Sequence, residues 1–368
     1  MIPFCIVPIL AITFFSDRVA FFLHVVIILL ASFLSDLGYE FTFLQIFAGI
    51  VTVLTFKATR YWGKFFKSVG FILVASLAAY FGLSLLREGD IANIEWDNFM
   101  WLFISAFLTL LAFPLIPLLE RVFGFTSSIS LSELSDLNRP LLKRLSNEAP
   151  GTFQHSLQVS NLSESAAEEI GANTLLVKVA ALYHDIGKLK KPQYFIENQS
   201  GYNPHDDLDE KESARIIIDH VAEGVKMAKA AGIPKILIEF IKTHHGTTRV
   251  EYFYQTYKSK YPDRNIVPED FTYPGPKPKS KEQAIMMIAD SLEASSKTLN
   301  SPTGNDIDKL VDNIISGKIE NGQLDQSKLS FADLEVCRRR FKKMLKSIHH
   351  VRIEYPDQKE ESSSKTVS

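Results

Sequence analysis

The stretch LLVKVAALYHDIGK, residues 175–188, decides the fold of the second half of this 368-residue chain. Its apolar residues recur at helical spacing, as at Leu175 and Val179, and the pattern runs into an adjacent histidine and aspartate, His184 and Asp185. An imidazole and a carboxylate placed side by side can bind one metal ion together. An isolated pair of this kind more often lies at a solvated helix end. A metal-binding role therefore depends on whether the rest of the chain supplies further ligands.

Further residues of the metal-binding kind lie on both sides of this pair. Most of them sit beside apolar helical faces, where a buried ionisable group needs a partner or a metal. The additional candidate ligands are His155, His220, His244, His245 and Asp290. Ligands on separate helices suit an all-α bundle whose interior collects them.

The number and type of these ligands predict two divalent metal ions. Five histidines and two aspartates, without a cysteine, exceed the needs of a four-coordinate structural zinc site. They suit two ions about 3.5 to 4 Å apart, which Asp185 would bridge. Histidine and carboxylate ligands accept manganese, iron or zinc alike, so the identity of the metal stays open.

Two metals can support the attack of hydroxide on a phosphodiester. They can lower the pKa of a shared water toward ~7 and hold a hydroxide ready for in-line attack. We therefore count Asp185 as catalytic as well as a ligand. Lys188 is placed to contact a phosphate oxygen or the departing 3′ oxygen, or else it is a solvated lysine at a helix end. His205 could protonate the leaving group or orient a ligand, or it could cap a loop.

Three further residues are candidates for substrate binding. Thr247 and Thr248 follow the paired histidines and could donate to phosphate, or they could merely end a helix. Tyr273 could stack on a base, although a packing role is favoured for it.

The first third of the chain is of a different kind, with five apolar runs at residues 2–15, 19–34, 41–56, 69–86 and 100–119. Several runs fall short of the ~20 residues that a spanning helix needs. Five runs in succession, without amphipathic helices between them, nevertheless cannot all be covered by soluble partners. We predict a bundle of about five transmembrane helices in a lipid bilayer. The first run lacks a basic segment and a cleavage site, so we expect no signal peptide.

Charges in the loops predict the orientation of this bundle. Loops 36–40 and 87–97 are mainly acidic, whereas four basic residues separate the third and fourth runs: Lys57, Arg60, Lys64 and Lys67. The positive-inside rule places the basic loop in the cytosol. The N-terminus is then outside, and everything beyond Arg121 is cytosolic.

Composition divides the chain into four parts. Residues 1–120 form the transmembrane region, the serine-rich residues 121–138 a linker, residues 139–355 the metal-binding helical domain and residues 356–368 a disordered tail. We expect an ordered proline-rich loop at 252–281, and a helix at 331–347 with Ser330 as its N-cap.

The net charge of −2 argues against duplex nucleic acid as a partner of this chain. Both cysteines are expected to be free thiols.

The order of the ligands, His, His-Asp, His, His-His and Asp, resembles the HD phosphohydrolase superfamily. More narrowly, the motifs APGTFQHS, YHDIGK, FIENQ, NPHDD, THHGT, YPGPKPKSKE and IADSLEASS resemble the seven-transmembrane HD family of bacterial cyclic di-AMP phosphodiesterases. The resemblance implies hydrolysis of cyclic di-AMP to linear pApA, ligand roles for all seven residues, and a multi-pass protein of the bacterial inner membrane. Members of that family usually have seven spans and a large external domain after the first. A truncation at the N-terminus is therefore expected.

Two other functions remain as alternatives. A related phosphodiesterase acting on cyclic di-GMP would be expected to show a GYP segment after the paired histidines, where this chain has HHGTT. A receptor that binds a cyclic dinucleotide without cleaving it would be favoured by degenerate ligands, whereas all seven are present here. The oligomeric state stays open, and a homo-oligomer is one of the alternatives.

Overall fold

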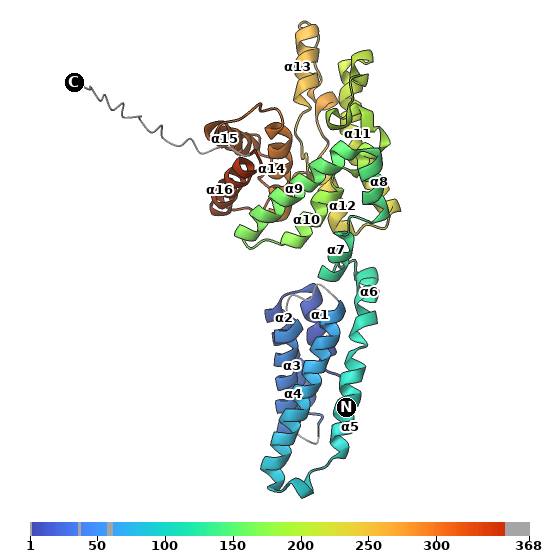
Figure 1. Cartoon of the computed structure of the whole chain (residues 1–368), viewed down its shortest axis with the longest axis vertical. Coiled ribbons are helices and arrows are strands. Elements are labelled where there is room, and N and C mark those ends of the chain that lie inside the picture. Colours follow the sequence, from blue (N-terminus) through green and yellow to red (C-terminus); the bar gives the residue numbers. More distant parts are fainter. Residues whose placement is uncertain (1, 36–37, 57–61, 350–368) are drawn as a thin grey trace, which may run out of the picture.

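The computed structural model describes residues 2–35, 38–56 and 62–349, which form two helical bodies joined end to end (Figure 1). Among these residues the β pairing is limited to one isolated bridge, between Arg249 and Thr272. The predicted all-α fold is therefore confirmed.

Six helices build the first body, a long bundle. They are α1 Ile6–Phe14, α2 Asp17–Ser32, α3 Gly38–Phe56, α4 Trp62–Glu88, α5 Asp97–Thr109 and α6 Ala112–Phe123. Figure 1 shows α4 running away from the second body and α5 and α6 returning toward it, nearly in one line. Arg87 at the far end of α4 pairs with Glu40 of α3 at 3.1 Å.

Three stretches of this bundle are long and apolar enough to cross a membrane: Gly38–Phe56, Gly63–Glu88 and Asp97–Phe123. At most a third of each is buried inside the bundle. Large apolar side chains therefore point outward, as in Leu54, Phe71 and Phe107, which are 71%, 60% and 72% exposed. Such a surface is stable only when lipid covers it, and the chain is a membrane protein. The first two predicted runs correspond to α1 and α2, of nine and 16 residues, so the count of five spans stays a prediction.

The second body begins after a short connector. Its helices are α7 Ser128–Leu134, α8 Pro140–Glu148, α9 Pro150–Glu169, α10 Thr174–Tyr183, α11 Glu210–Ala230, α12 Lys235–Thr243, α13 Glu251–Lys260, α14 Lys281–Ser296, α15 Gly304–Glu320 and α16 Phe331–Ile348. Helices α9 and α10 lie at its centre and pack on α14. One apolar core joins these helices, and it contains the fully buried Leu162, Val179, Ile288 and Phe341.

The predicted helix at 331–347 is confirmed as α16, which begins with a capping box of Ser330 and Asp333. The predicted loop at 252–281 is partly wrong, because its first third is helix α13. The aromatic residues that indicated a loop stabilise this helix instead. Tyr257 packs on Ala214 and Phe271 in a small apolar cluster. The predicted tail at 356–368, together with Asp36, Lys57 and Arg60, lies outside the described residues.

Candidate metal centre

The structure brings all seven predicted ligands together from five helices. His155 lies on α9, His184 and Asp185 follow α10, His220 lies on α11, His244 and His245 follow α12, and Asp290 lies on α14. They form two groups in which all the ligand atoms lie within 4.8 Å of one another. We call these the Asp290 group, of His155, His184 and Asp290, and the His220 group, of Asp185, His220, His244 and His245.

The adjacent His184 and Asp185 fall into different groups. Asp185 Oδ2 lies 3.2 Å from His184 Nε2 and 3.5 Å from His155 Nε2, whereas Asp185 Oδ1 lies 3.2 Å from His220 Nε2. One carboxylate therefore presents one oxygen to each group. This is the placement that a bridging ligand needs.

The histidine rings are oriented by bonds on their outer side. The Nδ1–H groups of His184, His220 and His244 donate to the carbonyl oxygens of Ala181, Ile217 and Ile241, each three residues earlier, at 2.7, 2.5 and 2.7 Å. Each bond leaves a lone pair on Nε2, directed into the cluster. His220 Nε2 and His244 Nε2 accordingly face each other at 3.2 Å.

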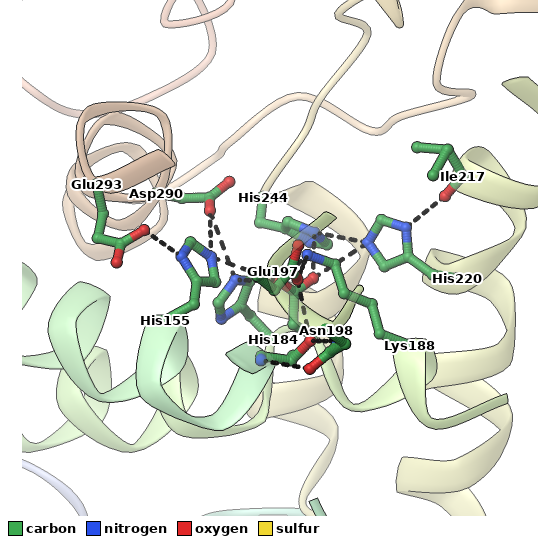
Figure 2. Close-up of polar contacts among 12 residues, drawn as sticks. His155, His184, Lys188, Glu197, Asn198, Ile217, His220, His244, Asp290 and Glu293 are labelled. Carbon is green, nitrogen blue, oxygen red and sulfur yellow. Dashed lines mark hydrogen bonds and ion pairs between the residues drawn. The ribbon is translucent and has the colours of Figure 1, made fainter. Parts of the chain in front are cut away.

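Glu293 has the same orienting role for His155. Figure 2 shows the His155 ring between two carboxylates, with Nδ1 2.5 Å from Glu293 Oε2 and Nε2 3.0 Å from Asp290 Oδ1. The sequence prediction missed Glu293. The signal was its position three residues after Asp290, which places both carboxylates on one face of α14.

Buried atoms of the cluster lack hydrogen-bond partners. Within the described residues, His184 Nε2 and Asp185 Oδ1 are buried and have no neighbour aligned for a hydrogen bond. Leaving such groups unsatisfied is costly in a protein interior. A divalent ion in the Asp290 group would satisfy His184 Nε2, and one in the His220 group would satisfy Asp185 Oδ1, so the residues fit divalent metal.

The electrostatics favour added positive charge at the same place. Burial alone would raise the pKa of the Asp185 carboxyl, but His184 and Lys188 outweigh this effect and hold its pKa well below the usual range. Burial opposes protonation of His184, yet the nearby carboxylates of Asp185 and Asp290 raise its pKa to about 10. When no metal is bound, a proton on His184 supplies the positive charge instead.

A glycine allows the two halves of the centre to meet. Gly187 follows the His184–Asp185 pair, and a Cβ added to it would lie 1.8 Å from the carbonyl oxygen of His220. Only glycine therefore lets α11 pack this closely, and that packing places His220 against Asp185.

Lys188 is largely enclosed beside the cluster, with its side chain 13% exposed. Its Nζ lies 2.8 Å from Asp185 Oδ2 and 2.7 Å from Glu197 Oε1. Burial would lower the pKa of Lys188, but these two carboxylates raise it, so the ammonium stays charged. Glu197 also accepts from the Thr152 hydroxyl at 3.0 Å, which ties this ion pair to the start of α9.

Three members of the cluster, His155, His245 and Asp290, line a cavity of about 610 Å³. Other residues that line it are Lys188, Thr248, Arg249, Tyr273 and Lys318. Tyr273 stacks on the His245 ring, with centroids 4.2 Å apart, which agrees with a packing role. The Thr248 hydroxyl already donates to His245 O at 2.7 Å. Thr247 is bonded to Gln323 and does not line this cavity.

His205 is not brought to the cluster. It lies in a neighbouring cavity of about 430 Å³ with Tyr194, Gln199 and Phe253. Its Nε2 lies 2.8 Å from Tyr194 O, and its ring packs on Phe253 with centroids 4.9 Å apart. This arrangement agrees with a loop-capping role.

Two family models match the two bodies. Residues 1–127 match the family described as 7TM receptor with intracellular HD hydrolase, and residues 152–295 match the HD domain, which contains all seven ligands. The chain belongs to this 7TM–HD family. The predicted resemblance is thereby confirmed.

Members of the 7TM–HD family are similar over most of this chain. The cyclic-di-AMP phosphodiesterase PgpH of Bacillus subtilis is 37% identical over 366 residues, which is 97% of this chain and 51% of that protein. The protein of the same name from Listeria monocytogenes is 41% identical over 252 residues, 68% of this chain and 35% of that protein. The chain thus spans about half the length of the B. subtilis protein and about a third of the length of the L. monocytogenes protein.

A solved structure is similar to the second body. It is the crystal structure of the HD domain of L. monocytogenes phosphodiesterase PgpH in complex with cyclic-di-AMP. The match has 41% identity and a TM-score of 0.56, and it covers 59% of this chain and 100% of that one. The HD fold of the second body is therefore shared with that domain.

Proposed function

We propose that this chain is a metal-dependent phosphodiesterase of the inner membrane that hydrolyses cyclic di-AMP to pApA. The observation that supports this most strongly is the convergence of seven imidazole and carboxylate groups in one cluster, of which His155, His245 and Asp290 line a 610 Å³ cavity. Cavities of about 300–1,000 Å³ hold small-molecule ligands and cofactors.

We further propose two divalent cations, one for each group, with Asp185 between them. The donors are imidazole nitrogens and carboxylate oxygens, a set that suits manganese or iron and also accepts zinc. When bound, two such ions would activate a water molecule and neutralise the charge that develops on a phosphoryl group. The outer bonds of the histidine rings hold the ligands ready, so little reorganisation is needed when metal binds.

Lys188 is the residue of this chain best placed to contact the reacting phosphate. Its ion pairs with Asp185 and Glu197 fix the ammonium at the cavity wall beside the cluster. There it would contact a phosphate oxygen or the departing 3′ oxygen. Thr248 lines the same cavity and can accept a hydrogen bond from substrate, whereas His205 and Thr247 are weaker candidates.

The choice of cyclic di-AMP rests on the relatives. Both PgpH proteins are cyclic-di-AMP phosphodiesterases, and the HD domain of one is solved with cyclic-di-AMP bound. The metal cluster explains cleavage of a phosphodiester and does not distinguish the bases.

Turnover measured on the full chain in detergent tests this proposal. The manganese-loaded protein is incubated separately with cyclic di-AMP and cyclic di-GMP, and the products are separated by chromatography. We expect pApA to form and cyclic di-AMP to be cleaved faster. Equal or faster cleavage of cyclic di-GMP would contradict the adenine preference. Tight binding of cyclic di-AMP without cleavage would instead support the receptor alternative.

We also propose that the HD domain faces the cytosol. Lys64 and Lys67 lie in the first turns of α4, at the end of the bundle nearer the HD domain (Figure 1), and Arg121 lies at the same end on α6. Basic residues at membrane ends favour the cytosolic side. A reporter fused after Ser368 should therefore be cytosolic and one inserted near Ile91 external. Both reporters on one side of the membrane would contradict this orientation.

A further inference from the structure

Lys318 of α15 reaches the catalytic cavity from outside the segment that matches the HD domain model. It lines the 610 Å³ cavity together with His155, Asp290 and Thr298. Helix α15 packs beside α14, which carries Asp290. The matched segment ends at residue 295, so α15 lies outside the part of the chain that the HD domain model matches.

Lys318 differs from the other cations that line this cavity. Lys188 pairs with Asp185 and Glu197, Lys297 with Glu293 Oε1 at 2.7 Å, and Arg249 with Glu251 Oε2 at 2.7 Å. Among the residues that the structure describes, no carboxylate lies within 4.0 Å of Lys318. Its side chain is largely enclosed, and this burial lowers its pKa although Asp290 opposes the shift. An enclosed ammonium without a partner is stabilised by an anion from outside the chain.

The proposed substrate brings such an anion. A cyclic dinucleotide carries two phosphodiesters, each with one negative charge. The metal cluster can neutralise the one that is cleaved, but the other enters the same cavity and needs a counter-charge of its own. The cavity wall follows α14 from Asp290 to Ser295, a rise of about 7.5 Å, so it extends beyond the cluster.

We propose that Lys318 binds the phosphodiester that is not being cleaved. This inference rests on the proposed function, and it makes α15 a determinant of selection for substrates with two phosphates. Because the contact is remote from the reacting phosphorus, it acts equally on bound substrate and transition state and so affects KM rather than kcat.

Assays with two substrates distinguish binding of the second phosphodiester from a general contribution of Lys318 to phosphodiester cleavage. The full chain in detergent, loaded with manganese, is assayed with cyclic di-AMP and with bis(p-nitrophenyl) phosphate, which has a single phosphodiester. In Lys318→Gln we expect KM for cyclic di-AMP to rise about tenfold or more, with kcat within about twofold of the unmodified chain. Hydrolysis of bis(p-nitrophenyl) phosphate should stay unchanged.

Matched variants control for charge and folding. Lys318→Arg keeps the charge and should restore most of the affinity for cyclic di-AMP. Lys309→Gln removes a charge from an exposed position of the same helix and should behave like the unmodified chain. Metal content measured on each variant verifies that the centre is intact.

Three results would overturn the inference. Unchanged kinetics of Lys318→Gln on cyclic di-AMP would show that the residue makes no such contact. An equal loss on both substrates would assign Lys318 to the cleaved phosphate or to the structure of the centre. If the unmodified chain cleaves bis(p-nitrophenyl) phosphate but neither cyclic dinucleotide, the proposed function fails, and the second-phosphate role fails with it.

Discussion

The two ligand groups of the metal centre differ in the direction in which the pKa values of their histidines are shifted. In the Asp290 group, the carboxylates of Asp290 and Glu293 outweigh burial and raise the pKa of His155, and those of Asp185 and Asp290 do the same for His184. In the His220 group, burial lowers the pKa of His244 and lowers that of His245 further. Asp185 presents one oxygen to each group, whereas Asp290 and Glu293 lie beside the rings of the Asp290 group, so these two carboxylates contribute most of the difference. We expect the two metal sites to be separable by experiment.

The largest effect should come from the residue that joins the groups. Asp185→Ala removes an oxygen from each group, so both metals should be lost and activity should fall by about a thousandfold or more. Metal analysis of the purified protein and turnover of cyclic di-AMP measure this effect.

The exposed Asp263→Ala serves as the matched control. Metal content and turnover near those of the unmodified chain in Asp185→Ala would rule out a shared centre. Insertion of the spans should be unaffected, because Asp185 lies far along the chain from the membrane bundle.

A smaller effect is expected when one group alone is disrupted. His155→Ala removes a ligand from the Asp290 group, and His220→Ala removes one from the His220 group. Each variant should keep about one metal per chain and lose about 100-fold in turnover, because both ions act on the same phosphate. Metal analysis is the decisive measurement. Loss of both metals from each variant would show that the groups cannot be occupied separately.

Glu293→Gln should weaken metal binding by the Asp290 group without removing any of its ligands. Its amide can still contact His155 Nδ1 but no longer carries the charge that raises the pKa of this ring. Removing outer partners of ligating histidines costs about 10- to 100-fold in metal affinity. We expect that loss for one of the two metals, measured by titration, whereas the exposed Glu320→Gln should show none. Equal weakening of both metals would mean that Glu293 supports the whole fold of the centre.

The contrast between ligands and their partners also explains what could be predicted from sequence. The convergence of the seven residues was predictable because several buried ionisable groups beside apolar helical positions need a partner or a metal. The assignment of the adjacent His184 and Asp185 to different ligand groups was not predictable from the sequence. It depends on the close approach of α11 to the chain at Gly187. Glu293 and Lys318 were missed for a related reason. The spacing from Asp290 places Glu293 on the same face of α14, but its bond to His155 forms only where α14 packs on α9, and Lys318 reaches the cavity only where α15 packs on α14.

Proton competition should produce the smallest effect, and it separates the groups without any substitution. Carboxylates raise the pKa of His155, and they raise that of His184 to about 10, so the His184 ring holds a proton at neutral pH when no metal is bound and a metal must displace it. Each displaced proton weakens binding about tenfold for each unit by which the pH falls. Burial lowers the pKa values of His244 and His245, so protons compete with a metal less at these rings than at His184.

At a fixed concentration of free manganese, lowering the pH from about 8 to about 6 should therefore empty the Asp290 group first. Metal content should fall from two ions per chain toward one, with His155→Ala showing no such step because its remaining ion lies in the His220 group. Equilibrium dialysis at several pH values measures this. Simultaneous loss of both metals, or a step that persists in His155→Ala, would contradict the difference in charge between the groups. Turnover should follow the first loss, since one ion alone cannot both activate the water and balance the charge on the phosphate.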